Sequence, residues 1–185
     1  MQISEHKLRL FARHINDGGL IAYPTEAVFG FGCDPNNESA VIRLLQLKDR
    51  PVDKGLILIA AHFDLLEPYI DLHATHRLED IKATWPGPTT WLLPAHPSVS
   101  ELLRGNHATI AVRVTDHPIA AAISEKAATA LVSTSANKTG FEPAKTALKV
   151  RQYFKHNDLI IAHGMTSGLS HTTAIYDAMS GRKLR

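Results

Sequence analysis

Apolar residues recur along the chain with two spacings, which alternate from one segment to the next. Apolar positions every three or four residues predict amphipathic helices at residues 4–16 and 37–50. The run GLILIA at residues 55–60 has no polar member, which is typical of a strand buried on both faces. The remaining pattern predicts, in chain order, strand 20–23, helix 63–85 interrupted at Pro68, strands 90–95 and 109–115, helix 118–128, strand 130–136, helix 146–156, strand 159–163, and a hairpin of 173–179 with 183–185.

Strands that alternate with helices favour a layered α/β domain built around one sheet. The closing hairpin predicts that this sheet is mixed. With 185 residues the chain is long enough to bury a substantial core as one domain. We therefore expect a single α/β domain over residues 1–185, with a twisted mixed sheet flanked by helices.

The composition is that of an ordinary globular protein, with 44% hydrophobic residues, 21% charged residues and a net charge of +2. Cys33 is the one cysteine, which excludes a disulfide framework and fits a reducing cytosol. No apolar run approaches the roughly 20 residues that span a bilayer. Charges within residues 4–16 argue against a signal peptide. We expect a cytoplasmic location and no membrane partner.

Several familiar catalytic and cofactor motifs are absent from the sequence. There is no P-loop, no dinucleotide fingerprint and no nucleophile elbow. The eleven histidines are scattered and include no H-E-x-x-H, so we assign no metal site to side chains.

The stretch LVSTSANKTG at residues 131–140 ends a predicted strand in three consecutive hydroxyls, followed by an amide, a lysine and a glycine. It contains both S-x-x-K and K-T-G, which occur in serine–lysine amidohydrolases. In those enzymes the two motifs come from separate elements, whereas here both use Lys138. A serine–lysine amidohydrolase is therefore a minor alternative to a cradle for an anionic ligand.

Strand periodicity supports the cradle, because alternate side chains share one face of a strand. A buried arginine among apolar neighbours needs a partner, which can be a structural ion pair or a ligand carboxylate or phosphate. Two such sets of residues share a strand face, and each set contains polar side chains; we call them polar stripes. They are Ser133, Ser135 and Asn137 along and just after predicted strand 130–136, and Thr109, Ala111 and Arg113 on predicted strand 109–115.

Two further clusters fit an anionic ligand. In YPTEAVFGFG, at residues 23–32, Thr25 and Glu26 form a predicted turn, and the glycines after it would let the backbone approach a ligand. In LKDRPVDKG, at residues 47–55, Lys48 and Arg50 lie at a helix end, where capping of the helix dipole is the plainer role.

Together these segments resemble the YrdC-like family of threonylcarbamoyl-AMP synthases. The resemblance is carried by YPTEAVFGFG, LKDRPVDKGLILIA, WPGPTTWLL, IAVRVTDHP and LVSTSANKTG, in matching order and spacing, and it covers about residues 8–185. The length suggests the short bacterial form of the family.

The resemblance implies an α/β twisted sheet with a concave basic surface. It also implies synthesis of L-threonylcarbamoyladenylate and pyrophosphate from L-threonine, bicarbonate and ATP. Mg²⁺ would accompany ATP and bridge its phosphates. Partner proteins would then transfer the threonylcarbamoyl group to adenosine 37 of tRNA.

The resemblance also assigns roles to residues of this chain. The family's K-x-R and S-x-N residues would be catalytic and fall on Lys48, Arg50, Ser135 and Asn137. Threonine would be held by Thr25, Arg113 and Ser133, and ATP by Lys48, Arg50, Thr109, Ser135, Asn137 and Thr173. Because the carbamate of threonine attacks the α-phosphorus, these residues would position reactants and stabilise charge, and none would be a nucleophile.

The sequence departs from the family pattern at three places. Ala27 follows Glu26 where a threonine is frequent, Ala144 stands where many members have a serine, and Ala162-His163-Gly164 replaces an aspartate-glycine-glycine.

Two other functions remain open from the sequence alone. Residues 138–155 hold five basic residues against Glu142, so the domain could be an RNA-binding module without catalysis, or could add weak RNA binding to the enzyme. A carbamoyl-adenylate activity, like that of a related hydrogenase-maturation domain, is a third alternative.

Overall fold

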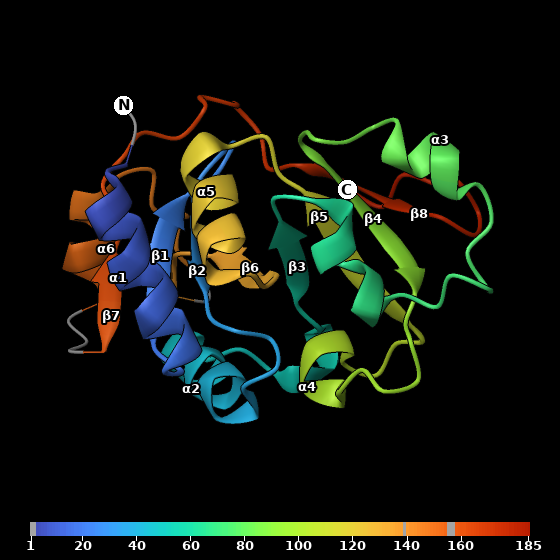
Figure 1. The fold of residues 1–185 in the computed structure, drawn as a ribbon, viewed down its shortest axis with the longest axis horizontal. Coiled ribbons are helices and arrows are strands. Elements are labelled where there is room, and N and C mark those ends of the chain that lie inside the picture. The colour runs from blue at the N-terminus through green and yellow to red at the C-terminus, as the bar shows by residue number, and fades with distance from the viewer. Residues whose placement is uncertain (1–2, 139, 155–157) are drawn as a thin grey trace.

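A mixed eight-stranded sheet forms the centre of the molecule, in a computed structural model that describes residues 3–138, 140–154 and 158–185 (Figure 1). The strand order is β7-β1-β2-β6-β3-β5-β4-β8, and parallel and antiparallel pairs both occur. The strands are β1 (Leu20–Pro24), β2 (Phe29–Gly32), β3 (Ile57–Ala60), β4 (Thr89–Pro94), β5 (Thr109–Val114), β6 (Leu131–Ser135), β7 (Leu159–Ile161) and β8 (Ala174–Asp177).

Helices cover both faces of the sheet, which confirms the predicted α/β class (Figure 1). On one face, α1 and α5 pack against each other and against Ile21, Ile59 and Leu131 of the strands. The next residues along the same strands point to the opposite face and join a second core. The helices are α1 (Glu5–Asn16), α2 (Glu38–Lys48), α3 (Leu78–Lys82), α4 (Glu101–Arg104), α5 (Pro118–Ala127) and α6 (Ala147–Tyr153).

Local signals explain where the main helices start and stop. The side chain of Ser4 caps α1, and that of Asn37 caps α2. Helix α2 ends because Asp49 adopts a left-handed conformation, with φ of 53°, two residues before the Pro51 that was predicted to stop it. This reversal places Lys48 and Arg50 at the edge of the site.

Strand β2 was not predicted, because its glycines were interpreted as part of a turn. The chain does turn at residues 25–28, and Thr25 N donates to Val28 O, but residues 29–32 then pair with both β1 and β6. A Cβ atom at Gly32 would lie 2.5 Å from the carbonyl oxygen of Val132, so the glycine allows two strands to approach closely.

The predicted helix over residues 63–85 is largely wrong. That segment contains two 3-10 turns, Phe63–Leu65 and Glu67–Tyr69, and the short α3. The predicted C-terminal hairpin is present: backbone hydrogen bonds join Ile175 to Leu184 and Arg185 and Asp177 to Arg182, around an antiparallel bridge between Tyr176 and Lys183. Helix α4 was not predicted. The predicted end of helix 146–156 falls outside the described residues.

No helix in the described part of the chain is both long and apolar enough to cross a bilayer.

Candidate active site

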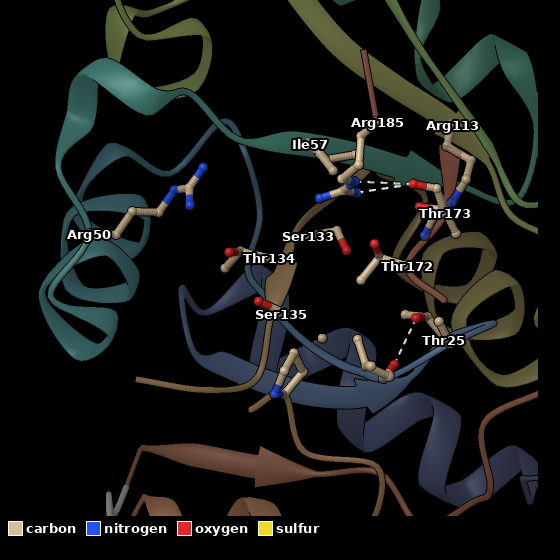
Figure 2. A pocket seen from close by; sticks show the side chains of 14 residues that line it. Thr25, Arg50, Ile57, Arg113, Ser133, Thr134, Ser135, Thr172, Thr173 and Arg185 are labelled. Atoms are coloured by element: carbon tan, nitrogen blue, oxygen red, sulfur yellow. Dashed lines mark hydrogen bonds between the residues drawn. The ribbon is translucent and has the colours of Figure 1, made fainter. Parts of the chain in front are cut away.

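A cavity of about 160 Å³ lies on the α1/α5 face of the sheet and is lined there by Arg113 of β5 and by Ser133 and Ser135 of β6 (Figure 2). Figure 2 shows Arg50 at one end and Arg113 at the other, with the hydroxyls of Ser133 and Ser135 between them. The lining residues are Thr25, Ala27, Val28, Gly30, Arg50, Ile57, Arg113, Ser133, Thr134, Ser135, Pro143, Thr172, Thr173 and Arg185.

The register of the sheet explains why residues far apart in sequence meet here. Ile57 of β3 lies opposite both Ala111 of β5 and Ser133 of β6. Arg113 lies one pleat further along the same face, opposite Ile59. Ser133 and Ser135 therefore share a face of β6, as strand alternation predicted, and the register places Arg113 of β5 on the same face of the sheet.

A second hollow of about 210 Å³ shares Arg50 and Ser135 with the cavity, so the two adjoin. It brings together all four predicted K-x-R and S-x-N residues. Its lining residues are Lys48, Arg50, Pro51, Lys54, Ser135, Asn137 and Gly140. Thr109 is not among the lining residues of either hollow.

Arg113 is buried at the bottom of the cavity, with 4% of its surface exposed. Its Nη2 atom lies 3.2 Å from Oε2 of the buried Glu26. Its Nη1 atom donates to the hydroxyls of Thr173, at 2.8 Å, and Thr90, at 3.3 Å. The structural ion pair that the sequence left open is thus present, and a role toward a ligand would be additional to it.

Thr25 lines the cavity from the turn after β1. Its hydroxyl donates to Val28 O at 2.7 Å, and its backbone oxygen accepts from Ser167 N at 3.3 Å. These bonds fix the turn in which Thr25 and Glu26 lie, and a lone pair of the Thr25 hydroxyl stays available to a ligand donor.

Lys48 is buried, with 4% of its surface exposed, although it lies at the end of α2. Its ammonium donates to the backbone carbonyls of Ser135 and Asn137, the second at 2.9 Å. Burial, together with the charge of Arg50, lowers the pKa of Lys48 to about 8. Lys48 therefore fixes the S-x-N turn as well as bringing positive charge to it.

Arg50 is half-buried and braces the turn that follows α2. Its Nε and Nη2 atoms donate to the backbone oxygen of Gly55, at 3.2 Å and 2.7 Å. Burial lowers the pKa of Arg50 below its ordinary value, but a guanidinium remains charged at neutral pH. Arg50 thus faces both hollows as a fixed cation.

Ser135 is oriented by an amide and has no base at its hydroxyl. Its Oγ donates to Oδ1 of Asn137 at 2.6 Å, and Nδ2 of Asn137 donates to the backbone oxygens of Lys138 and Phe141. Lys48 contacts the backbone of Ser135, and Lys138 is exposed. This arrangement suits a hydrogen-bonding cradle, because an amide oxygen is no general base at neutral pH. Thr139 of the K-T-G motif lies outside the described residues.

Thr173 lies against Arg113, away from Lys48, although the sequence assigned it to the nucleotide. Its backbone oxygen accepts from Arg185, whose Nε and Nη2 atoms lie 3.3 Å and 3.2 Å away. Arg185 and Thr172 also line the cavity and were missed, because they belong to no recognisable sequence pattern. Thr134 lines it too, although strand alternation predicted that it faces away from Ser133 and Ser135.

The three departures from the family pattern are all accommodated by packing. Ala27 lines the cavity, and Ala144 is fully buried with its backbone bonded to Phe29 and Ala136. Ala162 N donates to Ala22 O and extends the pairing of β7 with β1.

The basic stretch predicted at residues 138–155 lies on the surface, as far as it is described. Lys138, Lys145, Lys149 and Arg151 are exposed, whereas Lys155 lies outside the described residues. Arg151 contacts His163 at 2.7 Å, and Lys149 lies over the Tyr153 ring. These contacts are those of an ordinary solvated helix.

Comparison with known proteins places the chain in a family. The model of the Sua5/YciO/YrdC family, described as "Telomere recombination", matches residues 13–185. A protein named threonylcarbamoyl-AMP synthase from Methylococcus capsulatus is 48% identical over 99% of this chain and 98% of its own length. One of the same name from Nitrosococcus oceani is 48% identical over 97% of each chain.

Solved structures agree with the fold. P. abyssi Sua5 in complex with L-threonine has a TM-score of 0.87 at 33% identity, and it covers 97% of this chain and 53% of its own. The chain thus spans about half the length of that Sua5 protein. E. coli YciO has a TM-score of 0.80 at 25% identity, over 95% of this chain and 85% of its own. The chain therefore belongs to the Sua5/YciO/YrdC family.

Proposed function

We propose that this chain is a threonylcarbamoyl-AMP synthase, which forms L-threonylcarbamoyladenylate and pyrophosphate from L-threonine, bicarbonate and ATP. One observation carries the proposal. A cavity with a buried arginine among hydroxyls adjoins a hollow that holds the K-x-R and S-x-N residues. The near-full-length relatives that bear this name support the same assignment.

The cavity near Arg113 suits the amino acid. A guanidinium fork can bind a carboxylate, and the hydroxyls of Thr25 and Ser133 can bind the polar groups of threonine. Val28 and Ile57 supply apolar surface beside them for its methyl group. The complex of P. abyssi Sua5 with L-threonine supports this choice of ligand. Because Thr173 bonds to Arg113, we place Thr173 at this end of the site.

The adjoining hollow suits the phosphates of ATP. Lys48, Arg50 and Lys54 bring positive charge, and the Ser135 hydroxyl can turn its hydrogen from Asn137 Oδ1 to a phosphate oxygen, while Asn137 holds the turn in shape. The described residues contain no cluster of three or more His, Cys, Asp or Glu side chains that could hold a metal ion. Mg²⁺ would therefore be held mainly by the nucleotide phosphates, as is common for this ion.

Bond formation in this site needs no protein nucleophile. The amine of threonine combines with bicarbonate to give a carbamate and water, and a carbamate oxygen then attacks the α-phosphorus of ATP. The bond from that phosphorus to the pyrophosphate oxygen breaks, and pyrophosphate leaves. The protein holds the carbamate and the phosphates in line and stabilises the developing charge, which is the chemistry that Arg50 and the hydroxyl cradle can provide.

Single omissions of substrate test the proposal. Pyrophosphate release is measured in complete mixtures and in mixtures without threonine or without bicarbonate. The proposal expects release only in the complete mixture. Equal release without either substrate would mean that the protein hydrolyses ATP or activates another acceptor.

We further propose that the product passes to partner proteins that modify adenosine 37 of tRNA in the cytoplasm. The exposed cations Lys138, Lys145 and Lys149 could add weak RNA binding. Salt-dependent RNA binding without ATP turnover would instead support the alternative of a non-catalytic RNA-binding module.

A further inference from the structure

A buried carboxylate, Glu26, and a buried hydroxyl, that of Thr115, lie behind Arg113. Glu26 is 1% exposed and Thr115 is 2% exposed, and neither lines the cavity, whereas Arg113 does. The Thr115 hydroxyl donates to Oε1 of Glu26 at 2.6 Å, and Oε2 of Glu26 lies 3.2 Å from Nη2 of Arg113. The three side chains form a chain of contacts that ends at the cavity.

Among the described residues, some N–H groups of Arg113 have hydrogen-bond partners and others do not. A guanidinium has five N–H groups, and both of those on Nη1 have partners, Thr173 and Thr90. Glu26 Oε2 is close to Nη2, but it has no hydrogen bond of acceptable geometry among the described residues, and neither does Nε of Arg113. Nε is itself buried, so the Nε–Nη2 edge faces Glu26 without forming the two-pronged pair that a carboxylate makes with such an edge.

Thr115 accounts for this incomplete pairing. Its Oγ accepts from the backbone N–H of His117 at 3.2 Å, so its own hydrogen is directed to Glu26 Oε1. Both oxygens of a carboxylate lie in one rigid plane, so anchoring Oε1 limits where Oε2 can go. The backbone of Glu26 is held as well, because its carbonyl accepts from Leu169 N at 3.1 Å.

We propose that Thr115 is a positioning residue that keeps Glu26 from closing a two-pronged pair with Arg113. Glu26 then neutralises the buried guanidinium without drawing it away from the cavity, so that Arg113 can still meet the carboxylate of the amino-acid substrate there. The proposal rests on the proposed function, because that substrate carboxylate is the one carried by threonine. It assigns a role to two buried residues that do not line the cavity.

Thr115→Val tests the proposal, because valine has the shape of threonine but no hydroxyl. Glu26 is then released and competes for Arg113. The expected result is a threonine KM raised at least about fivefold, with kcat at saturating threonine and the KM for ATP within about twofold of wild type. Thr115→Ser, which retains the hydroxyl, restores the threonine KM.

The double variant Thr115→Val/Glu26→Gln separates competition from general damage. A neutral amide cannot form the two-pronged ion pair, so the threonine KM falls back toward the wild-type value. Thr75→Val is the matched control, since Thr75 is buried, its hydroxyl bonds to Asp71 O, and it lies outside the cavity. It is expected to leave the threonine KM unchanged.

Three outcomes would overturn the proposal: an unchanged threonine KM in Thr115→Val, an equal rise in Thr115→Ser, or no recovery in a folded double variant. If the double variant does not fold, the comparison of Thr115→Val with Thr115→Ser still decides. Wild-type protein in the same assay tests the proposed function separately from the role of Thr115. Absence of threonine-dependent pyrophosphate release there contradicts the proposed function itself.

Discussion

Arg113→Lys separates the structural role of the arginine from a role in binding substrate. Lysine retains a positive charge opposite Glu26, which lies 3.2 Å from the guanidinium. It offers a point charge on a flexible stem, however, and cannot reproduce the planar fork. We therefore expect the variant to fold and to lose threonine affinity selectively.

The magnitudes follow from the contacts of Arg113. Lysine cannot keep both hydrogen bonds from Nη1, to Thr173 and Thr90, together with the ion pair to Glu26. Loss of one or two of these bonds would cost about 1–2 kcal/mol of stability. Arg113→Met would leave Glu26 buried without its cation, which typically costs about 3–5 kcal/mol. Loss of a two-pronged bond to the ligand should weaken threonine binding at least about tenfold, or roughly 1.4 kcal/mol.

Calorimetric titration of threonine and of ATP against wild type and Arg113→Lys is the assay, with thermal unfolding to confirm that the variant is folded. We expect the dissociation constant of threonine to rise and that of ATP to change by less than about threefold. Unchanged threonine affinity in the folded variant would refute the reasoning. Arg113 would then serve only as the structural partner of Glu26.

Three further predictions concern the nucleotide end of the site. Lys48→Ala should abolish turnover and also destabilise the fold by about 1–3 kcal/mol, because two partly buried carbonyls lose their donor. Arg50→Ala should impair turnover with a smaller drop in melting temperature. The pKa of Lys48 is lowered to about 8, so the ammonium is protonated below that pH and kcat/KM should fall as the pH rises through 8. Lys48→Arg should move this fall in kcat/KM to higher pH. An unchanged pH profile in Lys48→Arg would assign the fall to another titrating group. Ser135→Ala should slow turnover without abolishing it, and intact-mass spectrometry during turnover should find no covalent adduct; an adduct at Ser135 would revive the serine–lysine alternative.

Much of the fold was predictable because its signals are local. The apolar spacing of α1 and α2, the unbroken apolar run of β3 and the alternation in β5 and β6 each identify one element and its buried face. Residues 63–85 misled the prediction, because helical spacing there is overridden by turns that pack Leu66 and Tyr69 into the core.

The candidate site was predictable only as far as strand alternation and motif resemblance reach. Alternation placed Ser133 and Ser135 on one face of their strand, as observed, whereas the register of the sheet shows that Arg113 shares that face. Nothing local in the sequence shows that Lys48 is buried against a turn nearly ninety residues away, or that Glu26 pairs with Arg113. Such partners depend on sheet register and helix packing, which only the assembled fold defines.

Mass spectrometry of the reaction product tests the central claim most directly. The protein is incubated with ATP, Mg²⁺, L-threonine and bicarbonate labelled with ¹³C, and the adenylates are analysed before they hydrolyse. The account predicts a threonylcarbamoyl-adenylate whose mass carries the single labelled carbon and whose formation stops when threonine is omitted. Formation of pyrophosphate with an unlabelled adenylate, or with no threonine in the product, would contradict it.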